Sequence, residues 1–139
     1  MEQFQKTYDK FSEDYQALSK VYERISSEMK DYEELSSTLK LLQEYVKESD
    51  DKVDIKMHMN LNEYIFADVK IKENNKVVVK MIENLYAELT YERALIFVEE
   101  KIKVLVKYLE ESKKQMAQLQ AHMDIFLLLN YELNNSSVK

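Results

Sequence analysis

The chain has 139 residues, the length of one domain, and contains no glycine, proline, cysteine or tryptophan, while 33% of its residues are charged. The lack of Gly and Pro favours long uninterrupted helices, and the lack of Cys excludes disulfides and thiolate metal sites. A formal net charge of −6, with basic residues alternating with acidic ones, argues against a nucleic-acid partner, because such binding needs a basic stripe.

The N-terminal residues 1–20 are rich in charges and lack the apolar core of a signal peptide, and no run of the chain approaches a membrane span. Together with the absence of cysteine, this predicts a protein of the cytoplasm without a membrane partner, and a nuclear pool is compatible with the same features.

Residues 1–49 are predicted to form an N-terminal coiled-coil helix. At about 1.5 Å per residue, a helix of this length would extend roughly 70 Å, which no globular core of this size could cover, so a partner helix is expected. Apolar side chains recur at alternating spacings of four and three, which is the pattern of a coiled-coil seam. The seam positions are Phe4, Tyr8, Phe11, Tyr15, Leu18, Tyr22, Ile25, Met29 and Tyr32, continuing more weakly through Ser36, Leu39 and Val46.

Residues 90–134 are predicted to form the partner helix, with Thr90 as its N-cap. The two helices have similar lengths and flank a compact insert, which predicts an antiparallel helical hairpin with both chain ends at its far end. Residues 135–139 are polar and are expected to fray. The seam positions of this helix are Leu95, Val98, Ile102, Leu105, Leu109, Ser112, Met116, Leu119, Met123, Phe126, Asn130 and Leu133.

The insert, residues 50–89, alternates apolar and polar side chains in steps of two, which is typical of β-strands with one buried face. Asparagines lie where this alternation breaks, near Asn62, Asn74-Asn75 and Asn84, and Asn is the non-Gly residue that best tolerates positive φ. The insert is therefore predicted to form two β-hairpins, which makes the chain an α+β protein. The alternating apolar positions are Val53, Ile55, Met57, Met59, Leu61, Ile65, Ala67, Val69, Ile71, Val77, Val79, Met81, Leu85, Ala87 and Leu89.

Two isolated hairpins are too small to be stable and leave strand edges open, so the insert is expected to assemble with other chains. This predicts an obligate hetero- or homo-oligomer built through the β-hairpins, with Leu61, Val69, Val79 and Leu85 facing a shared barrel core. The candidate oligomerisation residues are Leu61, Ile65, Val69, Val77, Val79, Leu85 and Leu89.

No pattern in the chain indicates a reaction centre. The two histidines, His58 and His122, fall in different elements, and a glycine-rich phosphate loop cannot exist without glycine. The paired acids lie at positions that the heptads mark as exposed, with no apolar pocket to shift their pKa values. We therefore expect no enzyme, no catalytic or metal-binding residue and no cofactor.

Apolar side chains gather at the two chain ends, which the hairpin arrangement would bring together at a distal tip. One interpretation is that they close the coiled coil. However, a two-helix seam buries one stripe, so at least two of the residues in the run 126–129 must face elsewhere and offer an interaction site. The candidate residues for client or partner binding are Phe4, Tyr8, Phe11, Phe126, Leu127, Leu128 and Tyr131.

The order of helix, two β-hairpins and helix resembles the α-type subunits of the prefoldin family. The resemblance is sharpest at residues 88–97, ELTYERALIF, which is similar to the family's E-L-T-x-x-E-A-x-x-F junction between last strand and second helix. Two further matches are Asn60-Leu61 followed by residues 66–68, and residues 121–123 followed by 127–129. Arg93 stands where relatives have an acidic residue, so the reciprocal capping box at Thr90 is lost and the Thr cap alone is expected.

The resemblance implies a non-catalytic subunit of a hetero-oligomeric chaperone, built with other α- and β-type prefoldin-like subunits. It also implies that the helix tips hold unfolded or partly folded clients without ATP. Within the family, the chain is most similar to a branch that works with an AAA-ATPase co-chaperone platform and acts as a transcription cofactor. Two alternatives remain: an ordinary prefoldin α subunit that delivers actin- or tubulin-like clients to a chaperonin, and a purely structural coiled-coil adaptor.

Overall fold

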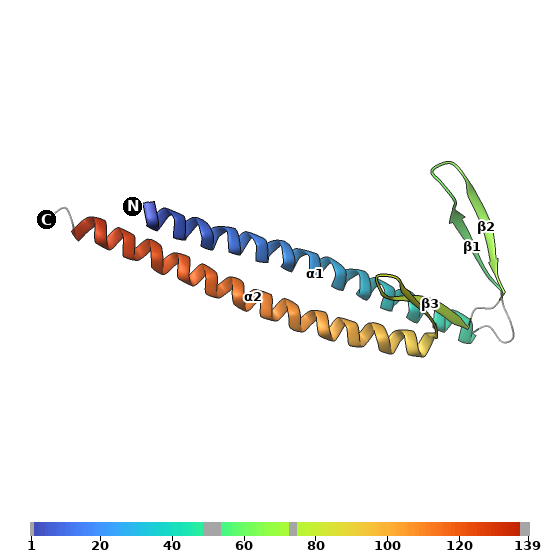
Figure 1. Cartoon of the computed structure of the whole chain (residues 1–139). Helices are drawn as coiled ribbons and strands as arrows, with labels where there is room; N and C mark the ends of the chain where they lie inside the picture. Colours follow the sequence, from blue (N-terminus) through green and yellow to red (C-terminus); the bar gives the residue numbers. More distant parts are fainter. Residues whose placement is uncertain (1, 49–53, 73–74, 137–139) are drawn as a thin grey trace. The chain divides into compact units, whose positions relative to one another are not determined.

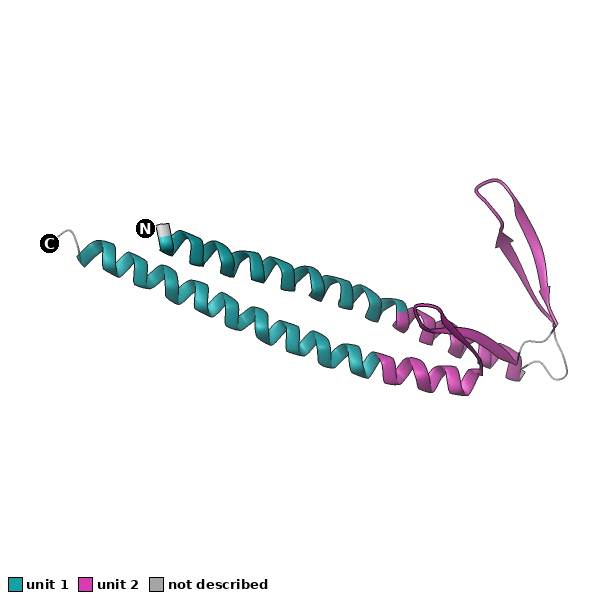
Figure 2. Ribbon diagram, viewed as in Figure 1, with its two compact units in different colours: residues 1–31, 102–139 teal, residues 32–101 magenta. Residues whose placement is uncertain are grey.

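The computed structural model describes residues 2–48, 54–72 and 75–136, and it contains two long helices separated by two β-hairpins (Figure 1). This confirms the predicted fold class and element order. The described chain divides into two compact units, residues 1–31 with 102–139 and residues 32–101 (Figure 2). The elements are α1 (Glu2–Glu48), β1 (Ile55–Asn60), β2 (Phe66–Ile71), β3 (Lys76–Ile82), β4 (Leu85–Thr90) and α2 (Tyr91–Ser136).

In the first unit, the N-terminal part of α1 and the C-terminal part of α2 lie side by side and run in opposite directions (Figure 2). The predicted seam of α1 is visible in the burial pattern, because every seam position from Phe4 to Tyr32 is partly buried while most residues between them are exposed. Farther along α1, Ser36 and Leu39 are buried. The spacing of three and four therefore identifies the buried stripe of α1 correctly.

The seam of α2 is confirmed as far as Asn130. Leu105, Ser112 and Met123 are buried, whereas Leu133, the last predicted seam position, is 67% exposed because it lies close to the helix end. The helix continues to Ser136, two residues beyond the predicted end at residue 134. The rest of the predicted tail, residues 137–139, lies outside the described residues.

The second unit holds the other part of the core, at the start of α2. Thr90 caps this helix as predicted, since its Oγ1 accepts a hydrogen bond from the backbone N–H of Arg93 at 3.4 Å. Ala94 and Val98 have no exposed surface, and burial raises the pKa of the Tyr91 hydroxyl. The buried side chains of this unit come from α1, β3 and α2 and are Ser36, Leu39, Val79, Tyr91, Ala94 and Val98.

The first hairpin pairs β1 with β2 in antiparallel register, from Ile55 opposite Ile71 to Asn60 opposite Phe66. The turn is built around Asn62, whose Oδ1 accepts the backbone N–H groups of Tyr64 and Ile65, both at 2.9 Å. The Leu61 N–H donates to the Ile65 carbonyl at 2.9 Å and closes the loop. The asparagine side chain thus takes the place of a glycine turn by binding the backbone directly. Val53, predicted to begin the first strand, lies outside the described residues.

The second hairpin pairs β3 with β4, from Lys76 opposite Thr90 to Ile82 opposite Leu85, with a shift in register between Lys80 and Ile82. This bulge leaves Met81 without an opposite partner in β4, although burial still alternates along the whole of β3 as predicted. The two-residue turn at 83–84 joins the strands and contains Asn84, at one of the predicted turn positions. A bulge next to a tight turn increases the local twist of a hairpin. Within the described ranges, no helix is apolar enough over sufficient length to cross a membrane.

Candidate functional site

One face of the first hairpin is apolar and partly open to solvent. Met57 and Met59 lie on this face and expose 46% and 48% of their surface. Each hairpin is a two-stranded sheet, so each described strand has one edge with unpaired backbone N–H and C=O groups. An apolar face beside an unpaired edge is suited to strand addition from another chain. The face consists of Ile55, Met57 and Met59 of β1 with Ala67, Val69 and Ile71 of β2.

The opposite face of this hairpin is polar except for Phe66, whose ring stacks on His58 with centroids 6.0 Å apart. His58 Nδ1 pairs with Asp68 Oδ1 across the strands, and the Lys70 Nζ lies 2.5 Å from Asp54 Oδ2. Residues 56–58 and 68–70 line an open depression of about 540 Å³. Because both partners of the His58 pair are well exposed, the pair contributes little to stability. His58 is exposed to solvent. The apolar face is therefore the candidate surface for contact with another chain.

The second hairpin differs because its inner face is already covered within the unit. Val79 is only 6% exposed, and Val77 and Leu89 are partly buried. Its outer face carries large apolar side chains in the open, among them Val78 at 69% and Ile82 at 70%. Val79 therefore stabilises its own chain and, in this conformation, has no surface left to offer to a shared barrel core.

The remaining predicted oligomerisation residues divide between turns and strand faces. Leu61 and Ile65 lie outside the strands, in the Asn62 turn, and expose 62% and 52% of their surface because the turn hydrogen bonds end the strand pairing there. Leu85 is 57% exposed at the start of β4, whereas Val69 is half-buried on the apolar face of β2. The alternating pattern identified the two faces of the strands. It could not show that Leu61 and Ile65 lie in the turn and outside the strands.

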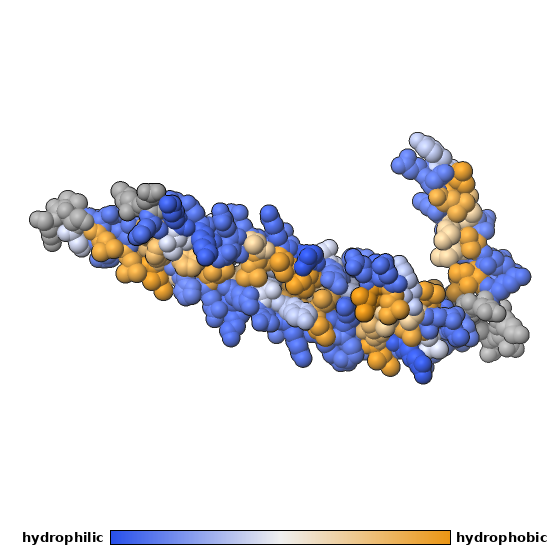
Figure 3. Space-filling model, viewed as in Figure 1, coloured by the Kyte–Doolittle hydropathy of each residue, from blue (hydrophilic) through white to orange (hydrophobic). Residues whose placement is uncertain are grey.

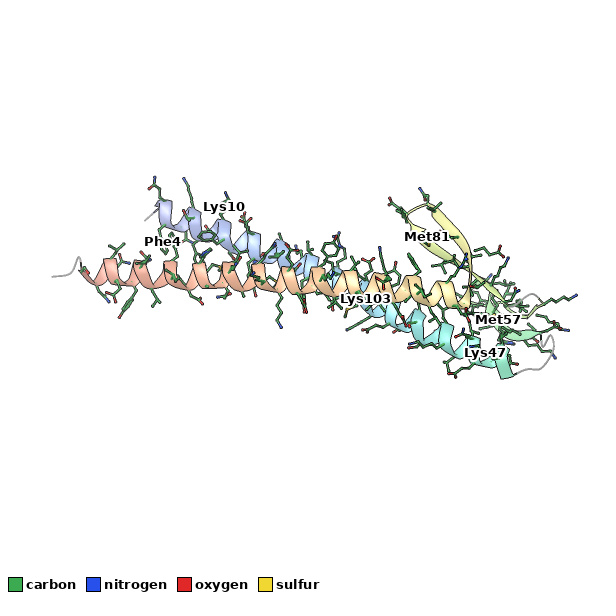
Figure 4. The ribbon with its side chains drawn as sticks, turned by 90° about the horizontal axis from the view of Figure 1, so that it is seen from below. Phe4, Lys10, Lys47, Met57, Met81 and Lys103 are labelled. Atoms are coloured by element: carbon green, nitrogen blue, oxygen red, sulfur yellow. The ribbon has the colours of Figure 1, made fainter. Side chains whose placement is uncertain are left out.

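The ends of the two helices meet through aromatic rings. Phe4 and Phe126 stack with ring centroids 4.4 Å apart, and Phe11 meets Phe126 edge to face at 6.1 Å. Figure 4 shows Phe4 turned toward α2 and Lys10 pointing away from it. Aromatic contacts of these geometries are favourable beyond the area they bury. Phe4, Phe11 and Phe126 thus close the end of the helix pair, as in the first of the two interpretations of the tip, and Tyr8 is also partly buried.

The other predicted tip residues are open to solvent. Leu127, Leu128 and Tyr131 expose 45%, 65% and 65% of their surface. Leu129, which belongs to the predicted run 126–129, and Ile125, which the prediction did not include, are exposed to a similar extent at 56% and 55%. Figure 3 shows apolar surface on the last turns of α2 and again on the first hairpin. The run of apolar residues 126–129 indicated Leu129. The heptad count could have indicated Ile125, because it places Ile125 off the seam.

A shallow groove of about 330 Å³ adjoins these residues. It is lined by Thr7 and Phe11 of α1 and by His122, Ile125 and Phe126 of α2. The His122 ring lies 6.2 Å from the ring of Phe11. The groove and the exposed leucines form one continuous candidate surface for apolar segments, since Ile125 belongs to both. Among the residues that the structure describes, no group of three acidic or histidine side chains could hold a metal ion.

Comparison with known proteins agrees with this architecture. The family model described as prefoldin subunit matches residues 11–127. A chain in the cryo-EM structure of filamentous PFD from Methanocaldococcus jannaschii has the same fold, with a TM-score of 0.68 and 21% identity, over 88% of this chain and 97% of that one. No curated protein matches the sequence. Because the family model covers most of the chain, the chain belongs to the prefoldin subunit family.

Proposed function

We propose that the chain is a non-catalytic subunit of a prefoldin-like hetero-oligomeric chaperone, which assembles through its β-hairpins and holds non-native clients on the apolar ends of its helices. The observation that carries this proposal is the apolar surface that the structure leaves exposed on the β-hairpins and on the last turns of α2. Exposed apolar surfaces of this extent on a chain of this size indicate sites that other chains cover.

The assembly part of the proposal rests on the hairpins. The apolar face with Met57, Met59 and Val69 supplies area that another chain can bury, and Leu61 and Ile65 extend it at the Asn62 turn. Leu85 adds exposed apolar surface on the second hairpin. The unpaired strand edges supply directional hydrogen bonds to α- and β-type subunits. The chain similar to this one in filamentous PFD is itself part of an assembly, which supports the same use of the fold here.

The client part of the proposal rests on the helix ends. Exposed leucines and Tyr131 beside a shallow apolar groove can take many different apolar segments, because contacts of this kind depend on buried area rather than on precise geometry. Release then needs only competition from another binding surface, so no nucleotide is required. Handing the client on to a chaperonin would follow this step.

Within the family, we propose a place near the ubiquitously expressed transcript protein, based on the sequence similarity at residues 60–68, 88–97 and 121–129. Membership of this branch would mean that the chain works with an AAA-ATPase co-chaperone platform, acts as a transcription cofactor, and is found in the cytoplasm and the nucleus. An ordinary prefoldin α subunit serving actin- or tubulin-like clients is the second candidate. Identifying the chains that co-purify with the tagged protein separates the two.

The experiment for the client role changes the exposed residues and leaves the aromatic closure intact. Leu127, Leu128 and Tyr131 are replaced together by Ser or Gln in the assembled complex, and suppression of aggregation of a chemically unfolded client is followed by light scattering. We expect suppression to fall severalfold, because the exposed side chains supply most of the apolar contact.

The matched control replaces three exposed residues of α2 that lie away from its end, Ile96, Val104 and Tyr108, by the same side chains. This control is expected to keep full activity. Unchanged suppression by the variant at the helix end, in a complex of the correct mass, would contradict client binding there and would favour a structural coiled-coil adaptor.

A further inference from the structure

The last turns of α2 carry an exposed apolar surface whose neighbours on the same helix include acidic side chains but no lysine or arginine. We call the residues Ile125, Leu127, Leu128, Leu129 and Tyr131 the terminal surface. From Gln115 to Ser136 the chain contains no lysine or arginine, although 20 of its 139 residues are basic. The surface therefore lies on the longest part of α2 that offers no positive charge.

Two carboxylates stand directly beside the most central residue of this surface. Asp124 and Glu132 are four residues before and four residues after Leu128, so the three side chains lie on one stripe of the helix. Asp124 accepts a hydrogen bond from the neutral Gln120 amide at 3.0 Å, which leaves its charge uncompensated. The Ser136 hydroxyl binds the backbone carbonyl of Glu132 and not its carboxylate. The negative charge on both sides of Leu128 is thus available to a partner.

An acidic side chain also lies on the α1 side of the groove next to the terminal surface. Its lining by Thr7, Phe11, His122, Ile125 and Phe126 is almost wholly apolar and can take one large side chain. The exposed Asp14 follows Phe11 by three residues and thus lies on the same side of α1.

Lys10, which precedes Phe11 in the sequence, does not point toward α2 (Figure 4). Figure 4 shows Lys10 directed away from α2. A segment that places an apolar side chain in the groove would therefore pass acidic side chains on both helices.

We propose that the terminal surface selects non-native polypeptide segments in which large apolar side chains alternate with lysine or arginine. The apolar contacts supply affinity for any unfolded chain, whereas the carboxylates attract segments with basic residues and repel segments with acidic ones. This inference rests on the proposed client binding at the helix ends and adds to it the charge of the preferred client.

The test compares three peptides of equal length that share the same leucine positions and carry Lys, Gln or Glu between them. Each is labelled with a fluorophore, and its binding to the assembled complex is measured by anisotropy at about 50 mM and about 300 mM NaCl, where the Debye length falls by more than half. We expect the Lys peptide to bind about fivefold more tightly than the Gln peptide at low salt, and the Glu peptide to bind most weakly. The differences should shrink at high salt.

The diagnostic variant combines Asp124→Asn with Glu132→Gln, which removes the charges and keeps the shape of the side chains. It should lower the affinity for the Lys peptide to the level of the Gln peptide and leave binding of the Gln peptide unchanged. The matched control, Glu110→Gln with Glu111→Gln, removes two exposed charges from the same helix outside the terminal surface and should change neither.

The outcomes separate this inference from the function on which it rests. If all three peptides bind equally, or if the control variant has the same effect as the diagnostic one, selection by charge at the terminal surface is wrong while client binding stands. If none of the peptides binds to a complex of correct mass, both the inference and the proposed client binding are overturned.

Discussion

At the scale of single residues, an asparagine and two aromatic side chains form the first hairpin turn and close the end of the helix pair. Asn62 replaces a glycine turn by binding two backbone N–H groups through its own side chain. Phe4 and Phe126 close the helix pair by ring stacking. Both solutions are local, so each can be tested with one substitution.

The turn prediction concerns Asn62. Replacing Asn62 by Ala removes the acceptor for the N–H groups of Tyr64 and Ile65 and should lower the free energy of unfolding of the hairpin by about 1 kcal/mol. Thermal or urea unfolding of the assembled protein measures the change. Asn75→Ala, at an exposed asparagine just before β3, is the control.

The aromatic prediction concerns Phe4. Phe4→Ala removes the ring that stacks on Phe126 and should cost about 1–2 kcal/mol, less than a fully buried Phe→Ala change, because Phe4 is only partly buried near a helix end. Tyr131→Ala, at a side chain that is 65% exposed, should change stability by less than about 0.5 kcal/mol. Circular dichroism during thermal unfolding compares the two, and equal effects would contradict the stacking account.

At the scale of elements, the periods of the sequence predicted most of what the structure contains. Steps of three and four identified the buried stripes of both helices, and steps of two identified both hairpins, because each pattern records a face that must leave water. The Thr90 cap was predictable from the residue type. The end of α2 was not, since polar residues such as Asn135 and Ser136 can prolong a helix or end it.

The candidate surfaces were less predictable than the elements. Alternation placed Val79 on an apolar face but could not show that its own unit would cover that face. The same pattern extended the strands to Leu61 and Ile65, which the Asn62 turn removes from them. The bulge after Lys80 depends on the pairing of two strands, and a single strand carries no signal for it.

The prediction at this scale concerns the apolar face of the first hairpin. Met57→Lys places a charge in the surface proposed for other subunits and should prevent assembly, because an unpaired charge is costly to bury. Met57→Leu preserves the apolar area and should assemble normally. Lys56→Met, at the neighbouring position on the polar face, is a second control and should also assemble normally. Equal loss of assembly in Met57→Lys and Lys56→Met would contradict the assignment of faces.

At the scale of the whole molecule, we propose that the exposed apolar surfaces of this subunit have different partners. The hairpins are proposed to meet other subunits permanently, whereas the helix ends meet clients transiently. A chain with so much unsatisfied apolar surface is expected to aggregate or to associate when it is expressed alone, and co-expression with its partners should make it well behaved.

The most direct test of the central claim is the native mass of the purified chain, measured by size-exclusion chromatography with light scattering, alone and after co-expression with β-type prefoldin subunits. The account predicts a discrete complex of several chains in the second case, and dissociation or loss of that complex in the Met57→Lys variant. A stable monomer of 16.7 kDa under both conditions would contradict it.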